Sequence, residues 1–335
     1  MPDIVQNPLS GLSDTLVERA RQAQPLVARI EVEGRPARSG TFWRKDVVVA
    51  AEQAFARVEE AKVVLSDGSS FAAHLAGRDP GTNVVALKLD GTPDPAPFTD
   101  ADPHLGALAL AFGADEAGVS VRLGVIHSIG PAWYSRAGGR VDRRITLDMM
   151  MSGREEGGPV LDAAGGLLGI SALGPRRRVL VIPTATVEGV LEPLLNKGRI
   201  ERGWLGLSLQ PVLVSEGMQA EAGQSRGLMI MGVAKDGPAA QAGVLAGDIL
   251  VTLRGEGVSR PAMVAQRLGP EAVGQPIELR LLRAGKVLSL TATVAARPSG
   301  GAPRAGYALP WWHPMWRCEA GLPGWLRGAG TRLSN

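Results

Sequence analysis

The 335-residue chain has little of several features on which common kinds of protein depend. Its single cysteine, Cys318, excludes an intrachain disulfide. No run of about 18 apolar residues occurs, so the sequence predicts no transmembrane helix. The formal net charge is only +3, and the arginine-rich pieces 136–144 and 176–178 fall in predicted turns. We therefore expect no nucleic-acid partner, and basic residues are too sparse in the C-terminal tail to favour a membrane contact.

The N-terminal segment also lacks the features of a secretory signal. Residues 1–24 contain neither a basic n-region nor an apolar h-region. The sequence predicts a cytoplasmic protein, or a periplasmic one if its N-terminus is trimmed or misassigned. Leu16, Val17 and Ala20 have helical spacing, which predicts a short helix within residues 13–24.

Glycine and proline are abundant, with 44 and 24 residues, and they separate many short apolar runs. This pattern indicates a mostly β protein. The first set of predicted strands is 26–32, 38–43, 46–51, 62–65, 70–76 and 84–89. The second set is 106–112, 119–129, 143–148, 158–162, 166–173 and 179–182. Four prolines in residues 91–104 predict a linker between the sets, and residues 130–142 predict a loop.

Three short motifs carry a family resemblance. Residues 153–161 read Gly-Arg-Glu-Glu-Gly-Gly-Pro-Val-Leu, residues 38–54 end in Ala-Ala-Glu-Gln-Ala, and residues 77–89 contain Gly-Arg-Asp-Pro-Gly-Thr-Asn. In this order they resemble the nucleophile, histidine and aspartate segments of HtrA/Deg-type, trypsin-like serine proteases. The resemblance covers roughly residues 15–297 and implies a chymotrypsin-like double antiparallel β-barrel with a cleft between the barrels.

The resemblance also implies that the catalytic positions are altered. The serine, histidine and aspartate positions correspond to Glu156, Glu52 and Asn83, and the oxyanion loop is changed by Arg154 and Glu155. A serine triad needs a hydroxyl and an imidazole base. We therefore expect a catalytically degenerate member of the family, a pseudoprotease that is not an enzyme.

Residues 202–207, Arg-Gly-Trp-Leu-Gly-Leu, and 245–250, Leu-Ala-Gly-Asp-Ile-Leu, resemble two segments of a PDZ domain. Such α+β domains add a peptide C-terminus as an extra strand and hold its carboxylate with backbone N–H groups. The helix predicted over 261–268 and the strand over 205–209 flank the expected groove. The expected peptide-binding residues are Trp204, Leu205, Gly206, Leu207, Leu209, Met263, Val264 and Arg267.

The expected domains are an N-terminal segment with a short helix, a double-barrel domain, a PDZ domain and a Pro/Gly- and Trp-rich tail. Their boundaries are 1–24, 25–198, 199–297 and 298–335. The expected function is binding of protein C-termini or exposed apolar peptides, as a scaffold or a regulator. Family members commonly form trimers, so a homo-oligomer or a mixed assembly with an active relative is implied by resemblance only.

Two alternatives remain open. One is an active serine-type endopeptidase of protein quality control that uses an unrecognised set of residues. The other is a carboxylate or metal site in the cleft, where Glu52 and Glu156 are expected to face each other. A salt bridge through Arg154 is the preferred arrangement, so no metal and no cofactor are expected. None of the four histidines lies near the triad positions in the family pattern; they are His74, His104, His127 and His313.

Overall fold

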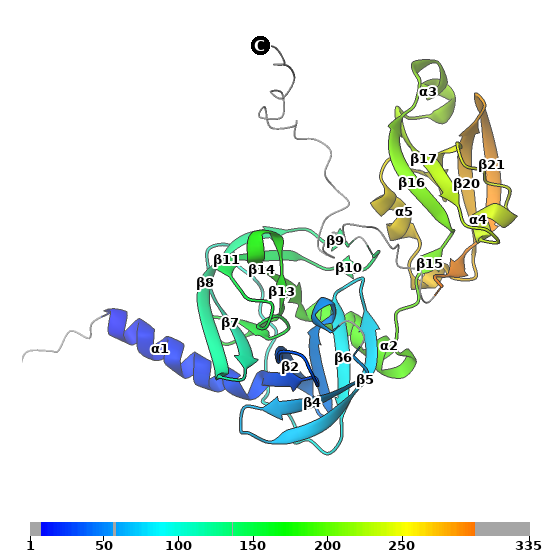
Figure 1. Ribbon diagram of the computed structural model, residues 1–335. Helices are drawn as coiled ribbons and strands as arrows, with labels where there is room; N and C mark the ends of the chain where they lie inside the picture. Colours follow the sequence, from blue (N-terminus) through cyan, green and yellow to red (C-terminus); the bar gives the residue numbers. More distant parts are fainter. Residues whose placement is uncertain (1–7, 56–57, 136, 299–335) are drawn as a thin grey trace, which may run out of the picture.

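The computed structural model describes residues 8–55, 58–135 and 137–298. Its first barrel closes in the strand order β1-β2-β3-β6-β5-β4 (Figure 1). The strands are β1 (Val27–Glu31), β2 (Arg38–Arg44), β3 (Val47–Ala51), β4 (Glu60–Leu65), β5 (Ser70–Asp79) and β6 (Val84–Leu89). Asp67-Gly68 forms the turn between β4 and β5, where the Gly68 N–H donates to the Leu65 carbonyl.

The second barrel closes in the order β11-β14-β13-β12-β7-β8. Its strands are β7 (Leu108–Asp115), β8 (Gly118–Gly130), β11 (Arg144–Met150), β12 (Pro159–Asp162), β13 (Leu167–Leu173) and β14 (Arg178–Pro183). The segment 130–142, expected to be a loop, contains a small hairpin of β9 (Trp133–Tyr134) and β10 (Arg140–Val141). The fold is therefore the predicted double barrel.

Both barrels and a helix share one apolar core. All five residues of β3 are buried, because one face of the strand points into its barrel and the other contacts the second barrel and α2 (Thr184–Lys197). Val187, Leu191 and Leu194 recur at helical spacing on the buried face of α2. The helix ends at Gly198, whose positive φ of 71° allows its N–H to reach the Leu194 carbonyl.

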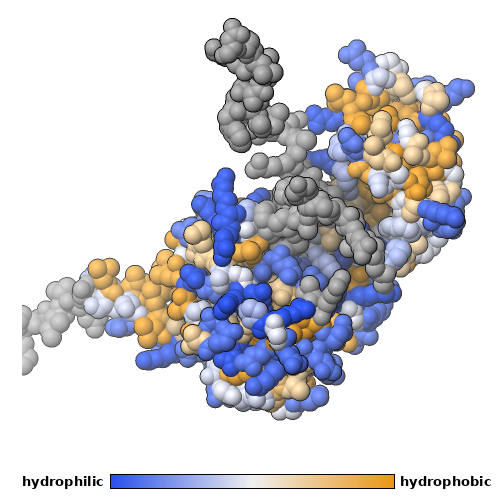
Figure 2. All heavy atoms as spheres, in the orientation of Figure 1, coloured by the Kyte–Doolittle hydropathy of each residue, from blue (hydrophilic) through white to orange (hydrophobic). Residues whose placement is uncertain are grey.

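The N-terminal helix α1 (Pro8–Ala23) extends the predicted helix toward the N-terminus. Leu16 and Ala20 pack against the shared core, whereas Leu9, Leu12 and Val17 are exposed. Figure 2 shows hydrophobic residues gathered over this helix at the left of the molecule. Short 3-10 turns are η1 (Gln24–Leu26), η2 (Glu52–Ala54) and η3 (Pro175–Arg177).

The C-terminal α+β domain lies to one side of the barrels (Figure 1) and is built on a sheet with the order β16-β17-β18-β20-β21. Its strands are β15 (Gly203–Trp204), β16 (Leu207–Leu213), β17 (Arg226–Val233), β18 (Ile249–Leu253), β19 (Glu256–Gly257), β20 (Pro276–Arg283), β21 (Lys286–Thr293) and β22 (Ala295–Ala296). Its helices are α3 (Glu216–Ala222), α4 (Pro238–Gln241), α5 (Pro261–Arg267) and η4 (Pro270–Ala272). The tryptophan-rich tail lies outside the described residues.

Candidate functional site

Two of the three positions that resemble the triad are neighbours because they lie on paired strands. Glu52 follows β3 and Asn83 precedes β6, the strand that pairs with β3. The Glu52 N–H donates to the Asn83 carbonyl over 3.1 Å, and the Gln53 N–H donates to the Asn83 side-chain oxygen over 2.8 Å. Asn83 holds a positive φ of 59°, a backbone conformation that asparagine tolerates better than most residues.

Glu156 lies in the loop before β12, and its side chain is buried with a relative exposure of 3%. Its Oε1 accepts a hydrogen bond from the Leu173 N–H at 2.8 Å and another from Gln53 Nε2. Burial raises the pKa of the Glu156 carboxyl, and these hydrogen bonds only partly oppose the increase. The group that reaches Glu156 from the first barrel is therefore Gln53, which the sequence interpretation missed.

Glu52 points to a different partner from the expected one. Its carboxylate lies 3.8 Å from the Arg78 guanidinium at the end of β5. Burial raises the pKa of Glu52, and the positive charge of Arg78 lowers it less than burial raises it. Glu52 and Glu156 thus both carry carboxyl groups whose charged forms are disfavoured by burial.

The predicted Arg154 bridge between Glu52 and Glu156 is wrong. The Arg154 carbonyl accepts hydrogen bonds from the Ser39 N–H and hydroxyl, at 2.9 and 2.8 Å. These contacts fix the backbone so that the half-exposed Arg154 side chain extends outward to Glu116, 3.5 Å away. The Glu52 carboxylate lies beside Arg78 instead, whereas Glu156 accepts neutral amide donors and is also under the positive charge of Arg38.

Glu155, next to Glu156, stabilises this loop through hydrogen bonds from Ser152 and Arg122. Glu155 Oε2 accepts the Ser152 N–H at 2.7 Å, and its Oε1 accepts Arg122 Nε at the same distance. Burial alone raises the pKa of Glu155, but these donors outweigh it, and the net pKa is lowered. Gly157 has a positive φ of 98°, and a Cβ there would meet the Ser39 carbonyl at 2.6 Å, so the loop needs glycine at this position.

The three positions that resemble the triad, Glu52, Asn83 and Glu156, supply two carboxyl groups and one amide. The Asn83 Nδ2 atom is buried without a hydrogen-bond partner in the described chain, although the amide lies near enough to Glu156 to lower that carboxyl's pKa. Among the histidines, His74 lies on β5, His127 on β8, and His104 contacts the Asp102 carbonyl; His313 lies outside the described residues. A hydrolytic reaction at these positions would not use a hydroxyl–imidazole pair supplied by them.

The structure also tests whether these acids gather into a metal-binding group. Within residues 8–55, 58–135 and 137–298, no three His, Cys, Asp or Glu side chains come together as a set of possible ligands. Glu52 and Glu156 each bind a separate partner, as described above. The partners of these two carboxyls are an arginine, a side-chain amide and a backbone N–H. All three donate hydrogen bonds, and none of them supplies a further oxygen ligand for a metal.

The expected peptide groove has a free strand edge beside a helix. β16 forms an outer edge of its sheet and pairs with β17 on one side only among the described strands. α5 packs against β16. Leu207 and Leu209 of β16 and Met263 of α5 are partly buried against the domain core. Val264, expected in the groove, is instead buried in that core with Leu205.

The loop that precedes β16 directs its carbonyls inward. The Leu205 and Gly206 carbonyls accept the N–H groups of Ala239 and Ala234, at 3.0 and 2.7 Å. No backbone acceptor among the described residues takes the Leu205 or Gly206 N–H. Gly206 makes this possible with a φ of 80°. Trp204 pairs with Ala295 through β15 and β22, and its ring lies beside Gly206.

Arg267, at the end of α5, does not extend into solvent as a free cation. Its guanidinium donates to the Met263 carbonyl at 2.7 Å and forms an ion pair with Glu256. Arg267 therefore bonds a carbonyl of α5 and links the helix to β19.

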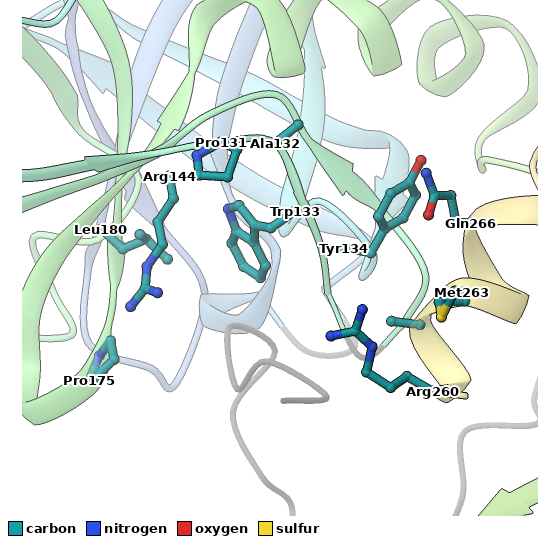
Figure 3. Close-up of a pocket in the computed structure, with 11 residues that line it drawn as sticks. Pro131, Ala132, Trp133, Tyr134, Arg144, Pro175, Leu180, Arg260, Met263 and Gln266 are labelled. Atoms are coloured by element: carbon teal, nitrogen blue, oxygen red, sulfur yellow. The ribbon is translucent and has the colours of Figure 1, made fainter. Parts of the chain in front are cut away.

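A cavity of about 560 Å³ lies where α5 meets the second barrel. Figure 3 shows the segment from Pro131 to Tyr134 on one side and Arg260, Met263 and Gln266 on the other. None of the residues that resemble the triad, Glu52, Asn83 and Glu156, lines this cavity. The residues that line the cavity include members of both α5 and the β9–β10 hairpin.

Comparisons with known proteins agree with this architecture. A family model described as a trypsin-like peptidase domain matches residues 38–170, and one described as a PDZ domain matches residues 203–294. The solved HtrA-type protease AlgW with a tripeptide superposes with a TM-score of 0.67 at 26% identity, over 84% of this chain and 97% of that chain. The chain thus combines a trypsin-like peptidase domain with a PDZ domain and resembles the HtrA-type proteases. Its family assignment from sequence is thereby confirmed.

Two proteins named as serine endoproteases are also similar over most of the chain. The serine endoprotease from Yersinia pestis has a TM-score of 0.70 at 25% identity and covers 84% of this chain and 98% of its own. A probable periplasmic serine endoprotease DegP-like from Brucella suis is 29% identical over 248 residues, which are 71% of this chain and 48% of that protein. The chain thus spans about half the length of the curated relatives it matches.

Two expectations from the sequence are corrected by these relatives. The prediction that the chain is not an enzyme is contradicted, because the matching domain is described as a peptidase and the relatives are named serine endoproteases. The prediction of a cytoplasmic location is not supported, because the relatives are named periplasmic. The first prediction rested on the three altered triad positions, and the second rested on the composition of residues 1–24. In the part of the chain that the structure describes, no helix combines the length and hydropathy needed to cross a bilayer.

Proposed function

We propose that this HtrA/Deg-type protein binds the free C-termini of polypeptides between β16 and α5 of its PDZ domain, residues 199–297. The observation that carries the proposal is the loop before β16. Its carbonyls bond inward, while the Leu205 and Gly206 N–H groups have no backbone acceptor among the described residues. Two adjacent N–H donors of this kind suit a carboxylate.

The edge of the sheet supports the same function. The outer side of β16 is unpaired in the described chain, so an incoming peptide can add to it as an antiparallel strand. Leu207, Leu209 and Met263 offer partly buried apolar contacts beside that strand. This chemistry suits a peptide that ends in an apolar residue with a free carboxylate.

The loop glycine provides a test with a matched control. Gly206→Val places a side chain on a backbone with a φ of 80°, where the added Cβ meets Ala234 at 3.0 Å and the Trp204 ring at 3.2 Å. Gly285→Val puts the same side chain on a φ of 83° in the β20–β21 turn, with nothing within 4 Å. We expect Gly206→Val to weaken binding of an apolar C-terminal peptide by about tenfold or more, because the N–H groups are displaced.

Gly285→Val should bind the peptide as the unaltered protein does, since it carries only the backbone strain. Fluorescence anisotropy of a labelled peptide measures both affinities on the full chain. Equal losses in the two variants would show that strain and not the loop decides binding, and would contradict the proposed site.

The endopeptidase activity in the names of the relatives is a second candidate. It is favoured by the match of residues 38–170 to a trypsin-like peptidase domain. We propose that Glu52, Asn83 and Glu156 occupy the positions that correspond to the triad in this fold. Burial raises the pKa values of Glu52 and Glu156, which favours the protonated form of each carboxyl relative to an exposed one.

Incubation of the full chain with unfolded casein tests this second candidate. Glu156→Ala is the matched variant, because Glu156 is the buried acid of the cleft. Cleavage that disappears in Glu156→Ala assigns the reaction to the cleft. Cleavage that persists unchanged in the variant places it elsewhere, and intact casein in both samples removes this candidate.

A further inference from the structure

The hairpin of β7 and β8 continues beyond the second barrel and leaves one side of β8 uncovered. β7 pairs with β8 without interruption from Leu108 opposite Val125 to Asp115 opposite Gly118. β11 reaches β8 only from Ile126 to Gly130. Among the described strands, residues 118–124 therefore have a neighbour on the β7 side and none on the other.

The hydrogen-bonding groups that face this open side can be identified. The Val125 N–H donates to the Asp148 side chain of β11 at 2.7 Å, so it points away from β7. Successive residues of a strand alternate in the direction of their N–H and C=O groups. Because the register with β7 is unbroken, the backbone groups of Val119, Val121 and Leu123 also point outward.

The same three residues carry an exposed apolar stripe. Their relative exposures are 39%, 48% and 47%, and residues two apart lie on one face of a strand. The opposite face carries Ser120 and Arg122, and Arg122 binds Glu155 at 2.7 Å. Residues 118–124 contain no lysine and no proline, the residues that commonly protect an open edge.

We propose that a second copy of this chain docks on this edge, by antiparallel pairing of β8 with its counterpart centred on Val121. In this register Val121 lies opposite the partner's Val121, and Val119 lies opposite the partner's Leu123. All outward N–H and C=O groups of the three residues then find partners. The apolar stripes of the two copies form one continuous face.

The charge pattern favours a second copy over an unrelated segment. Arg122 lies opposite the partner's Ser120 in this register and not opposite the partner's Arg122, so no like charges face each other directly. Each Arg122 charge is also offset by its own Glu155. The sequence Val-Ser-Val-Arg-Leu has an apolar residue at the centre and at equal distances from it, which suits a two-fold interface.

Engineered cysteines test both the contact and its register. In a Cys318→Ser background, which removes the sole native cysteine, Val121→Cys places a thiol on the two-fold axis. Opposed residues of a hydrogen-bonded pair have Cα atoms about 5.5 Å apart, within the range of a disulfide. Val119→Cys lies on the same face with similar exposure, but in this register its counterpart in the second copy is about 13 Å away.

Under mild oxidation we expect the Val121→Cys protein to form a disulfide dimer about tenfold faster than the Val119→Cys protein. A mixture of Val119→Cys and Leu123→Cys proteins should form a mixed dimer, since those residues face each other. Equal rates for Val119→Cys and Val121→Cys, or no dimer from Val121→Cys, would overturn the proposal.

A proline variant tests the contact without a crosslink. The Val121 N–H points away from β7, so Val121→Pro removes a donor that the single chain does not use within the hairpin. We expect this variant to keep the melting temperature of the unaltered protein and to show a lower average mass in sedimentation at high concentration. A folded Val121→Pro protein whose mass matches that of the unaltered protein at every concentration would contradict the pairing.

Discussion

At the scale of single residues, the buried acid Glu156 is the most informative feature of the cleft. It accepts hydrogen bonds from Leu173 and Gln53, yet burial still raises the pKa of its carboxyl. A carboxyl whose pKa is higher in the folded than in the unfolded state stabilises the fold at low pH. That contribution is complete below the ordinary value near 4.5 and is lost as pH rises through the folded-state pKa.

A neutral replacement should therefore be favourable at neutral pH. We expect Glu156→Gln to raise the melting temperature at pH 7, because it removes a buried charge and keeps an oxygen that can accept the Leu173 N–H. The gain should shrink as pH falls and the native carboxyl takes up a proton. Thermal unfolding of both proteins across pH 4 to 8 measures the difference.

Glu155 is the control, because its pKa is shifted in the opposite direction to that of Glu156. Arg122 and the Ser152 N–H keep the pKa of Glu155 below its ordinary value, so its contribution is present at neutral pH and lost on acidification. Glu155→Gln should lower the melting temperature at pH 7, and the loss should shrink at low pH. Parallel behaviour of the two variants would contradict the assignment of the shifts to local contacts.

Residue positions were predicted better than residue contacts. The short motifs predicted that Glu52 and Asn83 are neighbours, and the Glu52 N–H donates to the Asn83 carbonyl while the Gln53 N–H donates to the Asn83 side-chain oxygen. The side-chain partners could not be read from spacing, because they depend on the backbone of distant loops. The Arg154 carbonyl binds Ser39, which is 115 positions away, and that contact turns the Arg154 side chain outward.

At the scale of elements, the short apolar runs between turn residues located every barrel strand within a few residues. Where they failed, the deciding interactions were not local. The β9–β10 pair lies in a stretch of glycine and arginine, and it is positioned by a close approach between chain segments. A Cβ on Gly139 would lie 2.1 Å from the Gly81 carbonyl carbon, so the hairpin packs directly against the turn after β5.

That turn is also held by a buried ion pair from the connection between the domains. Arg202 donates to both oxygens of Asp79, at 2.6 and 2.8 Å, and Asp79 has a relative exposure of 1%. Burial by itself raises the pKa of Asp79, but Arg202 and the Thr82 and Gly81 donors reverse the direction and lower it. The partner of Asp79, Arg202, is 123 positions away in the sequence, so the spacing of the motifs did not reveal it.

Removal of the arginine should leave a buried carboxylate without its cation. We expect Arg202→Ala to destabilise the protein by about 3–5 kcal/mol, the usual effect of breaking a buried pair from one side. Arg199→Ala is the control, because the ion pair of Arg199 with Glu201, at 3.7 Å, is exposed. Urea unfolding monitored by tryptophan fluorescence compares them, and similar losses in both variants would contradict this role of Arg202.

At the scale of the whole molecule, the chain joins a double barrel to a PDZ domain with an open strand edge. The order of the motifs along the sequence was sufficient to predict this architecture, because each motif belongs to a separate supersecondary unit. The prediction that the chain is not an enzyme was wrong, because three substituted triad positions were taken to exclude any catalytic activity of the protein. The relatives named serine endoproteases correct that step.

The central claim is that the loop before β16 holds a free terminal carboxylate. Isothermal titration of the full chain with one peptide in two forms tests it most directly: the first form ends in an apolar residue with a free carboxylate, and the second is its C-terminal amide. The account predicts that amidation weakens binding by about tenfold or more, because the Leu205 and Gly206 N–H groups then meet a neutral group. Equal affinity for the two forms would contradict it.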